Sequence, residues 1–187
     1  QTAKQSYSIL GDLNLVGPAF LQLLLREFGP TIVALMVAAR VGAGIAAELA
    51  VMVSSEEVDA IRLAGGEPLP YLVSPRVIAM GIAMPTLVIF GSAVAFAAGG
   101  IATRAAYPVG FDTFFSLRLV GIPDVVLGFT KAVVFGFIVP IVACAIGLRA
   151  QGGTESVGQA TTDAVIVASL AVLVADFMLG AAFHLAG

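Results

Sequence analysis

The chain of 187 residues is 59% hydrophobic and only 11% charged, and its mean hydropathy is +1.05. Soluble domains are closer to half apolar and a quarter charged, so this composition excludes a water-soluble globular domain and indicates a protein surrounded by lipid. The net charge of −3, without a basic run, gives no sign of nucleic-acid binding, and the single cysteine excludes a disulfide framework within one chain.

The first long apolar run predicts a membrane helix. Residues 1–17 are typical of a loop with a short helix, and the apolar run then extends from Pro18 to about Ala50. About 20 residues at 1.5 Å each span the hydrocarbon core, so this helix is long enough to protrude into water. Pro30 lies within the run, which membrane helices tolerate.

The densely charged stretch that follows predicts a short helix outside the membrane. Ser54, with Glu57 three residues later, has the pattern of a capping box at a helix start. The pair Gly65-Gly66, followed by Pro68, is typical of a helix end. Between these signals there is room for about three turns, which is too short to cross a bilayer.

Three further spans are predicted, at about residues 76–100, 123–148 and 161–185. The connector 101–122 holds an aromatic cluster (Phe111, Phe114 and Phe115) that favours a helix lying at the membrane interface. Runs this long and this rich in Ala, Leu and Val exclude barrel strands. The predicted fold is therefore all-α: a polytopic helical membrane protein with four spans and one short helix outside the membrane.

Four ionisable side chains lie deep in the apolar runs: Arg26, Glu27, Lys131 and Asp176. A charge near the bilayer centre costs roughly 2.5–3.5 kcal/mol on insertion scales, so such residues usually face a bundle interior or a wet cavity. The sequence therefore predicts a membrane protein with a polar site inside its helical bundle. No P-loop, Ser/His/Asp set or Cys/His cluster is present, so we predict neither a catalytic nor a metal site, and no cofactor.

Six sequence blocks follow one another along the chain: 25–30 (LREFGP), 39–48 (ARVGAGIAAE), 55–76 (SEEVDAIRLAGGEPLPYLVSPR), 131–136 (KAVVFG), 152–162 (GGTESVGQATT) and 176–177 (DF). These blocks resemble the MlaE/YrbE family, the permease subunits of MCE-type ABC transporters that move lipids across the bacterial envelope. The resemblance covers about residues 18–185 in the family's order, with mild departures at Glu57, Ala64 and Ala145.

The resemblance implies one permease domain over 1–187 in the bacterial inner (cytoplasmic) membrane. Family members carry an interfacial helix and one more span before this point, so an N-terminal part of the domain is expected to be missing. It also implies a homodimer enclosing a lipid pocket, a cytoplasmic ABC ATPase subunit that hydrolyses ATP, and an MCE-domain lipid-binding protein on the opposite side. The implied function is movement of phospholipids between membranes of the cell envelope, by a subunit that is not itself an enzyme.

The resemblance also assigns candidate site residues. The stretch 54–66 resembles the family's cytoplasmic coupling helix, which engages the ATPase; an ordinary solvated turn is the alternative. Its candidate ATPase-coupling residues are Ser55, Glu56, Glu57, Asp59 and Arg62. In the lipid cavity, Arg26 is expected to meet the headgroup phosphate, although Arg26 and Glu27 could instead make structural pairs near the helix end. The candidate lipid-cavity residues are Leu21, Leu24, Arg26, Glu27, Phe28, Lys131 and Asp176.

Some alternatives stay open at this point. Lys131 and Asp176 could pair as a structural salt bridge, or Lys131 could contact lipid phosphate. The cargo could be sterols or fatty acids instead of phospholipid. An ion-coupled secondary transporter would use Lys131 and Asp176 as a relay without an ATPase, and a purely structural scaffold would tolerate alanine at all four buried charges.

Overall fold

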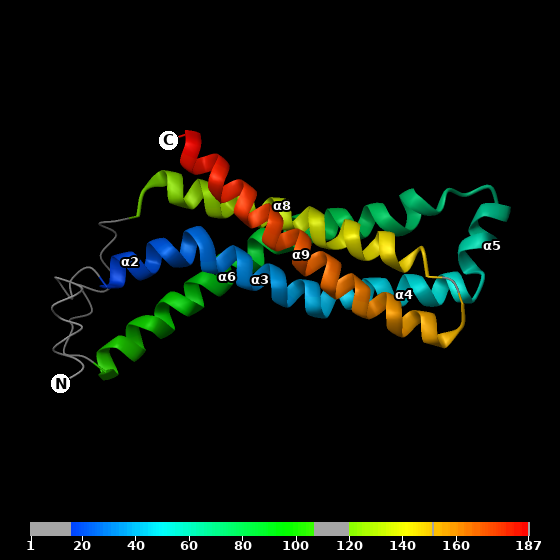
Figure 1. Cartoon of the computed structure of the whole chain (residues 1–187), viewed down its shortest axis with the longest axis horizontal. Helices are drawn as coiled ribbons and strands as arrows, with labels where there is room; N and C mark the ends of the chain where they lie inside the picture. Colours follow the sequence, from blue (N-terminus) through cyan, green and yellow to red (C-terminus); the bar gives the residue numbers. More distant parts are fainter. Residues whose placement is uncertain (1–15, 107–119, 151, 187) are drawn as a thin grey trace.

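The computed structural model describes residues 16–106, 120–150 and 152–186, and within these it is an elongated bundle of long helices (Figure 1). Four of them are long and apolar enough to cross a membrane: Pro18–Ser54, Leu69–Thr103, Ile122–Gly147 and Glu155–Leu185. The prediction of an all-α polytopic protein with four spans is confirmed. The aromatic cluster predicted to lie at the interface, and most of residues 1–17, fall outside the described residues.

The first span is one helical path with two π-helical turns in it. It runs through α2 (Val16–Leu23), η2 (Leu24–Phe28), α3 (Gly29–Val37), η3 (Ala38–Gly42) and α4 (Ala43–Ser54). The turn η2 stands directly before Pro30, and Gly29 donates its N–H to the carbonyl of Leu24, five residues back. Because proline has no N–H and its ring clashes with the preceding turn, a local widening of the helix is the expected response.

The short helix predicted outside the spans is α5 (Glu57–Leu63), which lies across the end of the bundle (Figure 1). The predicted capping box is wrong: Ser54 instead donates its hydroxyl to the carbonyl of Ala50 at 2.6 Å. Glu56 stands at the cap position in a left-handed conformation, with φ at 60° and no side-chain cap. The helix is also shorter than predicted, at seven residues.

The end of α5 follows the predicted glycine signal. Gly65 has φ at +79°, and its N–H bonds the carbonyl of Arg62 at 3.0 Å, while the N–H of Gly66 bonds that of Ile61 at 2.9 Å. These two bonds form a Schellman motif, which requires the left-handed conformation that glycine adopts without strain. Val58, 4% exposed, anchors α5 to the bundle.

The remaining path returns along the bundle three times. The turn η4 (Leu69–Val73) leads into α6 (Ser74–Ala106), which passes through Pro85, and α8 (Ile122–Gly147) and α9 (Thr154–Ala186) follow. The second span therefore begins about seven residues before the predicted Arg76.

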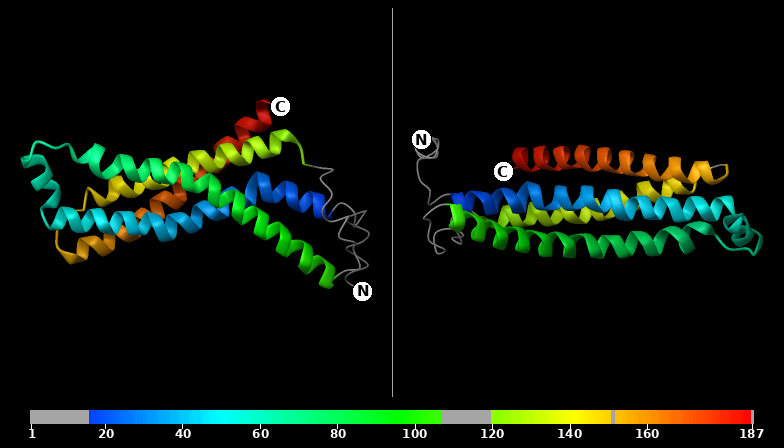
Figure 2. Two further views of the ribbon diagram at one scale, coloured as in Figure 1. Left: turned by 180° about the vertical axis from the view of Figure 1, so that it is seen from behind. Right: turned by 90° about the horizontal axis from the view of Figure 1, so that it is seen from below.

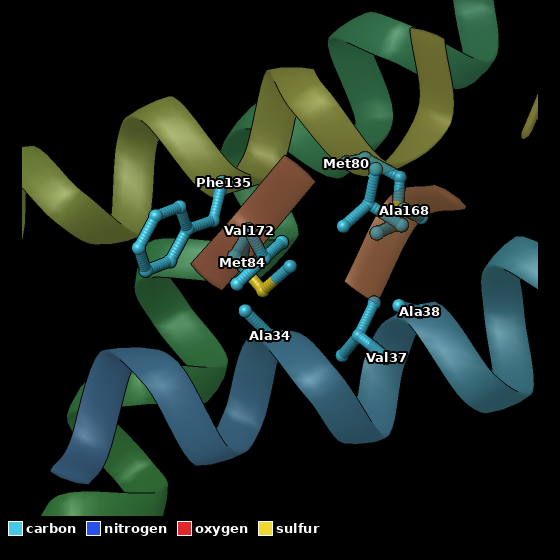
Figure 3. Packing of buried hydrophobic residues seen from close by; sticks show 9 residues of the cluster. Ala34, Val37, Ala38, Met80, Met84, Phe135, Ala168 and Val172 are labelled. Carbon is cyan, nitrogen blue, oxygen red and sulfur yellow. The ribbon is translucent and has the colours of Figure 1, made fainter. Parts of the chain in front are cut away.

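Helix α8 lies at the centre of the packing, between α6 and α9 and against the first span. A buried cluster joins the four spans around Phe135, Met84, Ala34 and Val172 (Figure 3). Glycine lets the backbones approach: a Cβ at Gly136 would lie 3.0 Å from the carbonyl oxygen of Met80. Close contact at small residues is the usual way in which helices associate in lipid.

Helices α6 and α9 diverge from the bundle at the end remote from α5 (Figures 1 and 2). Only 17% of the most apolar window of the last span is buried, against 44% in the third span. Large apolar side chains such as Phe90, Leu170 and Phe177 are exposed. These faces are therefore available to lipid or to another chain.

Candidate functional site

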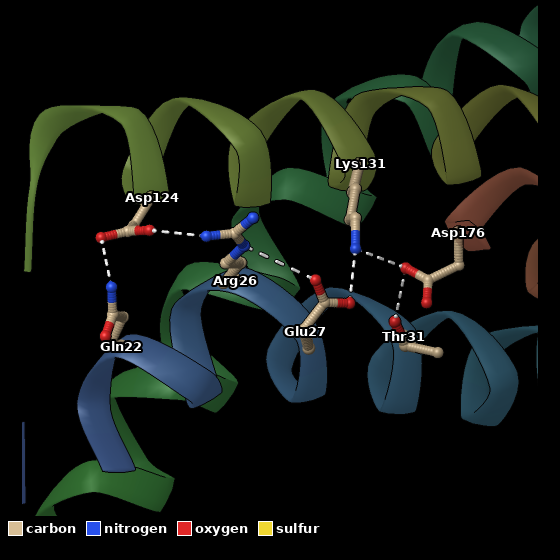
Figure 4. A network of polar contacts seen from close by, with 7 residues as sticks. All are labelled: Gln22, Arg26, Glu27, Thr31, Asp124, Lys131 and Asp176. Carbon is tan, nitrogen blue, oxygen red and sulfur yellow. Dashed lines mark hydrogen bonds and ion pairs between the residues drawn. The ribbon is translucent and has the colours of Figure 1, made fainter. Parts of the chain in front are cut away.

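The buried charges of three spans meet in one network, centred on Lys131 (Figure 4). The side chain of Lys131 is fully buried; its Nζ donates to Glu27 Oε2 at 2.6 Å and lies 2.8 Å from Asp176 Oδ1. Thr31 donates its hydroxyl to the same Asp176 oxygen at 3.0 Å. Lys131 therefore holds η2, α8 and α9 together, and the pair of Lys131 with Asp176 left open by the sequence is present.

Arg26 extends the network toward the start of α8. Its guanidinium lies 3.8 Å from Glu27 Oε1 and 3.6 Å from Asp124 Oδ1. Asp124 also accepts hydrogen bonds from the side chain of Gln22 at 3.1 Å and from the N–H of Gly121 at 3.0 Å. Asp124 thus caps its own helix while it orients Arg26.

The π-helical turn η2 places two adjacent charges in one network. Consecutive helical residues project about 100° apart, and the long side chains of Arg26 and Glu27 reach different points of the same helix. Arg26 reaches α8 at Asp124, and Glu27 reaches it at Lys131. Pro30 is the sequence feature behind this turn, and π-helical turns are frequent at functional sites.

The network has one more carboxylate than it has cations. Arg26 and Lys131 face Glu27, Asp124 and Asp176. The side chains of Lys131 and Asp124 are 0% and 10% exposed, whereas those of Arg26 and Glu27 are 33% and 38% exposed. Each buried charge has a partner of opposite sign, the network as a whole keeps one excess carboxylate, and Arg26 and Glu27 form its accessible edge.

The apolar residues predicted to line a lipid cavity lie in two different settings. Leu21 and Leu24, 7% and 6% exposed, are buried in the packing of the chain itself. Phe28 is 46% exposed. The sequence analysis did not identify Gln22, Thr31 or Asp124 as site residues. Of these, only Asp124 has a recognisable sequence pattern: it is an acidic residue in the first turn of a helix that begins at Ile122-Pro123.

An apolar groove of about 530 Å³ runs between α3 and the splayed part of α6. It is lined by Val33, Met36, Val37, Leu87, Phe90, Gly91, Val94 and Ala95. Val33 lies six residues, or roughly 9 Å along the helix, from Glu27. The groove faces α6, whereas Glu27 contacts Lys131 of α8, so the charged edge and the apolar groove lie on different sides of the same span.

The predicted coupling residues are on the surface at the opposite end. Ser55, Glu56, Glu57, Asp59 and Arg62 are all exposed. Arg62 pairs with Asp59 at 2.9 Å within α5. Leu63, which the sequence did not single out, is 90% exposed on this helix. Among the described residues, no group of three or more His, Cys, Asp or Glu side chains could hold a metal ion.

Comparison with known proteins decides the family. The family model for Permease MlaE matches residues 1–182. The chain belongs to the MlaE permease family. A probable ABC transporter permease of Rickettsia typhi is 39% identical over 187 residues, 95% of this chain and 70% of that protein. A probable ABC transporter permease of Rickettsia felis is 41% identical over 163 residues, 83% of this chain and 61% of that protein.

A plant relative carries a lipid in its name. The chloroplastic protein trigalactosyldiacylglycerol 1 of Arabidopsis thaliana is 33% identical over 181 residues, which are 96% of this chain and 52% of that protein. The chain thus spans about half to 70% of the lengths of these relatives. Its described residues include four helices long and apolar enough to cross a membrane, and with the family this makes it a multi-pass membrane permease subunit of the ABC transporter class, which implies a partner ATPase.

Proposed function

We propose that this MlaE permease moves phospholipids between membranes of the cell envelope, driven by a cytoplasmic ABC ATPase that docks on α5. The observation that carries the proposal is the partly exposed pair Arg26 and Glu27 at the edge of a buried network, on the span that also lines an apolar groove. An arginine binds phosphate by charge-assisted hydrogen bonds, and an apolar groove accommodates acyl chains. The plant relative named for a glycolipid supports a lipid cargo.

The same proposal includes a homodimer in the bacterial inner membrane and an MCE-domain partner on the side remote from α5. The sparse burial of α9 and the exposed apolar side chains of α6 leave surface for a second copy. Two copies related by a two-fold axis would place two such networks around one shared space. The network joins η2, the first half of α8 and the last part of α9, which lie in the half of the bundle remote from α5 (Figure 1). Lipid and ATPase would therefore engage opposite ends.

Lys131 acts in this proposal as the support of the site. Because its side chain is 0% exposed and bonded to Glu27 and Asp176, it fixes the geometry of Glu27 without touching lipid in this conformation. Arg26 is the residue that meets the headgroup phosphate.

The test is mass spectrometry of lipids that co-purify with the full transporter complex. The proposal expects phospholipids in excess over the bulk membrane composition, and a smaller yield of them from an Arg26→Ala variant. A Thr130→Ala variant, which changes an exposed hydroxyl bonded to its own helix, is the control. Enrichment of uncharged sterols, or an unchanged phospholipid yield from Arg26→Ala, would argue against the proposed cargo.

A further inference from the structure

The accessible edge of the charged network, Arg26 and Glu27, has unused hydrogen-bonding capacity (Figure 4). The guanidinium of Arg26 lies 3.8 Å from Glu27 Oε1 and 3.6 Å from Asp124 Oδ1, and both distances are too long for hydrogen bonds. Glu27 Oε2 accepts from Lys131 at 2.6 Å, whereas Glu27 Oε1 accepts no hydrogen bond from the residues that the structure describes. A cation with free donors therefore lies beside a carboxylate oxygen with free lone pairs.

These unbonded atoms are accessible from outside the chain. The side chains of Arg26 and Glu27 are 33% and 38% exposed. Among the described residues, Ser92 Oγ is the only buried side-chain nitrogen or oxygen without a hydrogen-bond partner. The unbonded nitrogens of Arg26 and the Oε1 atom of Glu27 are therefore not buried, and a ligand can reach them. Because unsatisfied polar groups are costly in an apolar setting, the pair favours a ligand that satisfies both groups at once.

Arg26 can turn to a ligand without leaving a buried group unbonded. The side chain of Asp124 is 10% exposed, and it keeps the hydrogen bonds from Gln22 at 3.1 Å and from the N–H of Gly121 at 3.0 Å when Arg26 moves away. The second carboxylate that Arg26 faces is that of Glu27, which is the more exposed of the two. Glu27 Oε1 is therefore the accessible anionic atom beside a ligand that Arg26 binds.

The charge balance of the network narrows the headgroup that fits. Three carboxylates face two cations, so the network carries one excess negative charge before any lipid binds. A headgroup whose only charge is its phosphate would bring a second excess negative charge and hold it close to Glu27. A headgroup with both a phosphate and an ammonium group brings the missing cation with it. Repulsion and attraction of this kind are strong where little water screens the charges.

We propose that the edge formed by Arg26 and Glu27 selects zwitterionic phospholipids over anionic ones. The phosphate accepts hydrogen bonds from the guanidinium of Arg26, and the ammonium group of the same headgroup pairs with Glu27 Oε1. Lys131 holds the other oxygen of Glu27, which leaves Oε1 for the headgroup. Glu27 is thus the residue that determines headgroup specificity. This inference rests on the proposed phospholipid transport and adds to it the charge type of the headgroup.

The test is competition between matched lipids for the full transporter complex. The complex is incubated with vesicles that hold equal amounts of phosphatidylethanolamine, phosphatidylglycerol and diacylglycerol, all with the same deuterated acyl chains, and the co-purifying deuterated lipids are quantified by mass spectrometry. Phosphatidylethanolamine should exceed phosphatidylglycerol by at least about fivefold, and both should exceed diacylglycerol. Equal retention of the two phospholipids, or an excess of phosphatidylglycerol, would overturn the headgroup selection alone. No excess of either phospholipid over diacylglycerol would contradict the proposed transport, and this inference with it.

A pair of variants separates headgroup selection from a structural role. Glu27→Gln removes the charge but keeps an oxygen that can accept from Lys131, so the two phospholipids should be retained about equally and still exceed diacylglycerol. Glu48→Gln makes the same change of charge at an exposed ion pair with Arg76 on the same span, and it should keep the wild-type ratio. If Glu27→Gln lowers retention of both phospholipids but preserves their ratio, Glu27 is structural and the proposal fails. The wild-type ratio tests the selection even where Glu27→Gln does not fold.

Discussion

At the scale of single residues, Lys131 determines how the charged network is held. It is fully buried, and it is the only cation within ion-pair distance of Asp176 among the described residues. Removing one member of a buried ionic cluster leaves the others without a counter-charge, and this usually costs more than the cluster as a whole contributes. The stability of the permease should therefore depend on whether the charges of Lys131, Glu27 and Asp176 compensate one another, and not on the presence of a lysine at position 131.

Lys131→Met tests this balance. The variant should lose about 3–5 kcal/mol of stability, because Glu27 and Asp176 remain as uncompensated carboxylates. Adding Glu27→Gln and Asp176→Asn should restore most of the loss. Thermal melting of the detergent-purified protein measures both changes. If the triple variant melts no higher than the single one, the cluster is not held by charge compensation.

Arg26 should behave differently, because it lies at the accessible edge of the network. Its ion pairs are long, at 3.6 and 3.8 Å, and its side chain is one-third exposed. Arg26→Ala should therefore cost less stability than Lys131→Met, because Asp124 keeps its hydrogen bonds from Gln22 and from the N–H of Gly121. The same variant should lower phospholipid transport by roughly tenfold or more, since a charge-assisted contact to phosphate is lost.

Transport measured together with the melting temperature separates these effects, and Arg26→Lys should keep part of the activity because it keeps the charge. A loss of activity that follows a loss of folded protein would show that Arg26 is structural.

At the scale of elements, α5 presents an apolar side chain on an acidic surface. Between Ser55 and Glu67 the chain carries four carboxylates and one arginine, and Leu63 among them is 90% exposed. Anionic lipid headgroups would repel this surface. A protein with a basic rim around an apolar pocket fits it better, and this is the chemistry we expect of the ATPase surface that receives α5.

Leu63→Ser is expected to reduce co-purification of the ATPase by about tenfold, because a central apolar anchor contributes a large share of binding energy at such interfaces. Leu185→Ser, at an equally exposed leucine near the end of α9, is the matched control and should have no effect. Equal retention of the ATPase by both variants would exclude Leu63 as an anchor.

Charge reversal in α5 should separate coupling from folding. Glu57→Lys combined with Asp59→Lys should abolish ATPase binding at physiological salt, while leaving membrane insertion intact, because both side chains are exposed. Pull-down of the ATPase and membrane fractionation provide the two readings. Unchanged pull-down would contradict a coupling role for α5.

The elements also show what the sequence could reveal. Hydropathy and length predicted the four spans, because the bilayer imposes both. The glycine pair at the end of α5 was read correctly, since few residues other than glycine adopt the conformation at Gly65. The Ser54–Glu57 pattern failed, because the first span continues through Ser54 and leaves its hydroxyl to bond the preceding turn.

The site was predictable only in part, for a physical reason. A charge in the bilayer core is costly in free energy and is therefore rare, so the charges within apolar runs mark candidate site residues in the sequence. These residues are Arg26, Glu27, Lys131 and Asp176. Their partners Gln22 and Thr31 are ordinary polar residues, and only the three-dimensional packing of three spans brings them to the charges. The π-helical turn at η2, which carries Arg26 and Glu27, has Pro30 as its one visible sign.

At the scale of the whole molecule, the two ends of the bundle differ in kind. One end carries the exposed acidic helix α5, whereas α6 and α9 diverge at the other end (Figure 2). A central helix that packs against three neighbours, and closely through glycines against α6 and the first span, can transmit a tilt from one end to the other as a rigid body. This arrangement suits a subunit in which nucleotide-driven motion at α5 changes the space around the charged network.

The most direct test of the account is phospholipid transfer by the complete complex, reconstituted with its ATPase in vesicles that hold a deuterated phospholipid. We predict transfer that requires ATP hydrolysis, that Arg26→Ala lowers roughly tenfold, and that the Glu57→Lys and Asp59→Lys pair abolishes. Transfer that continues without ATP, or that follows an ion gradient instead, would contradict it.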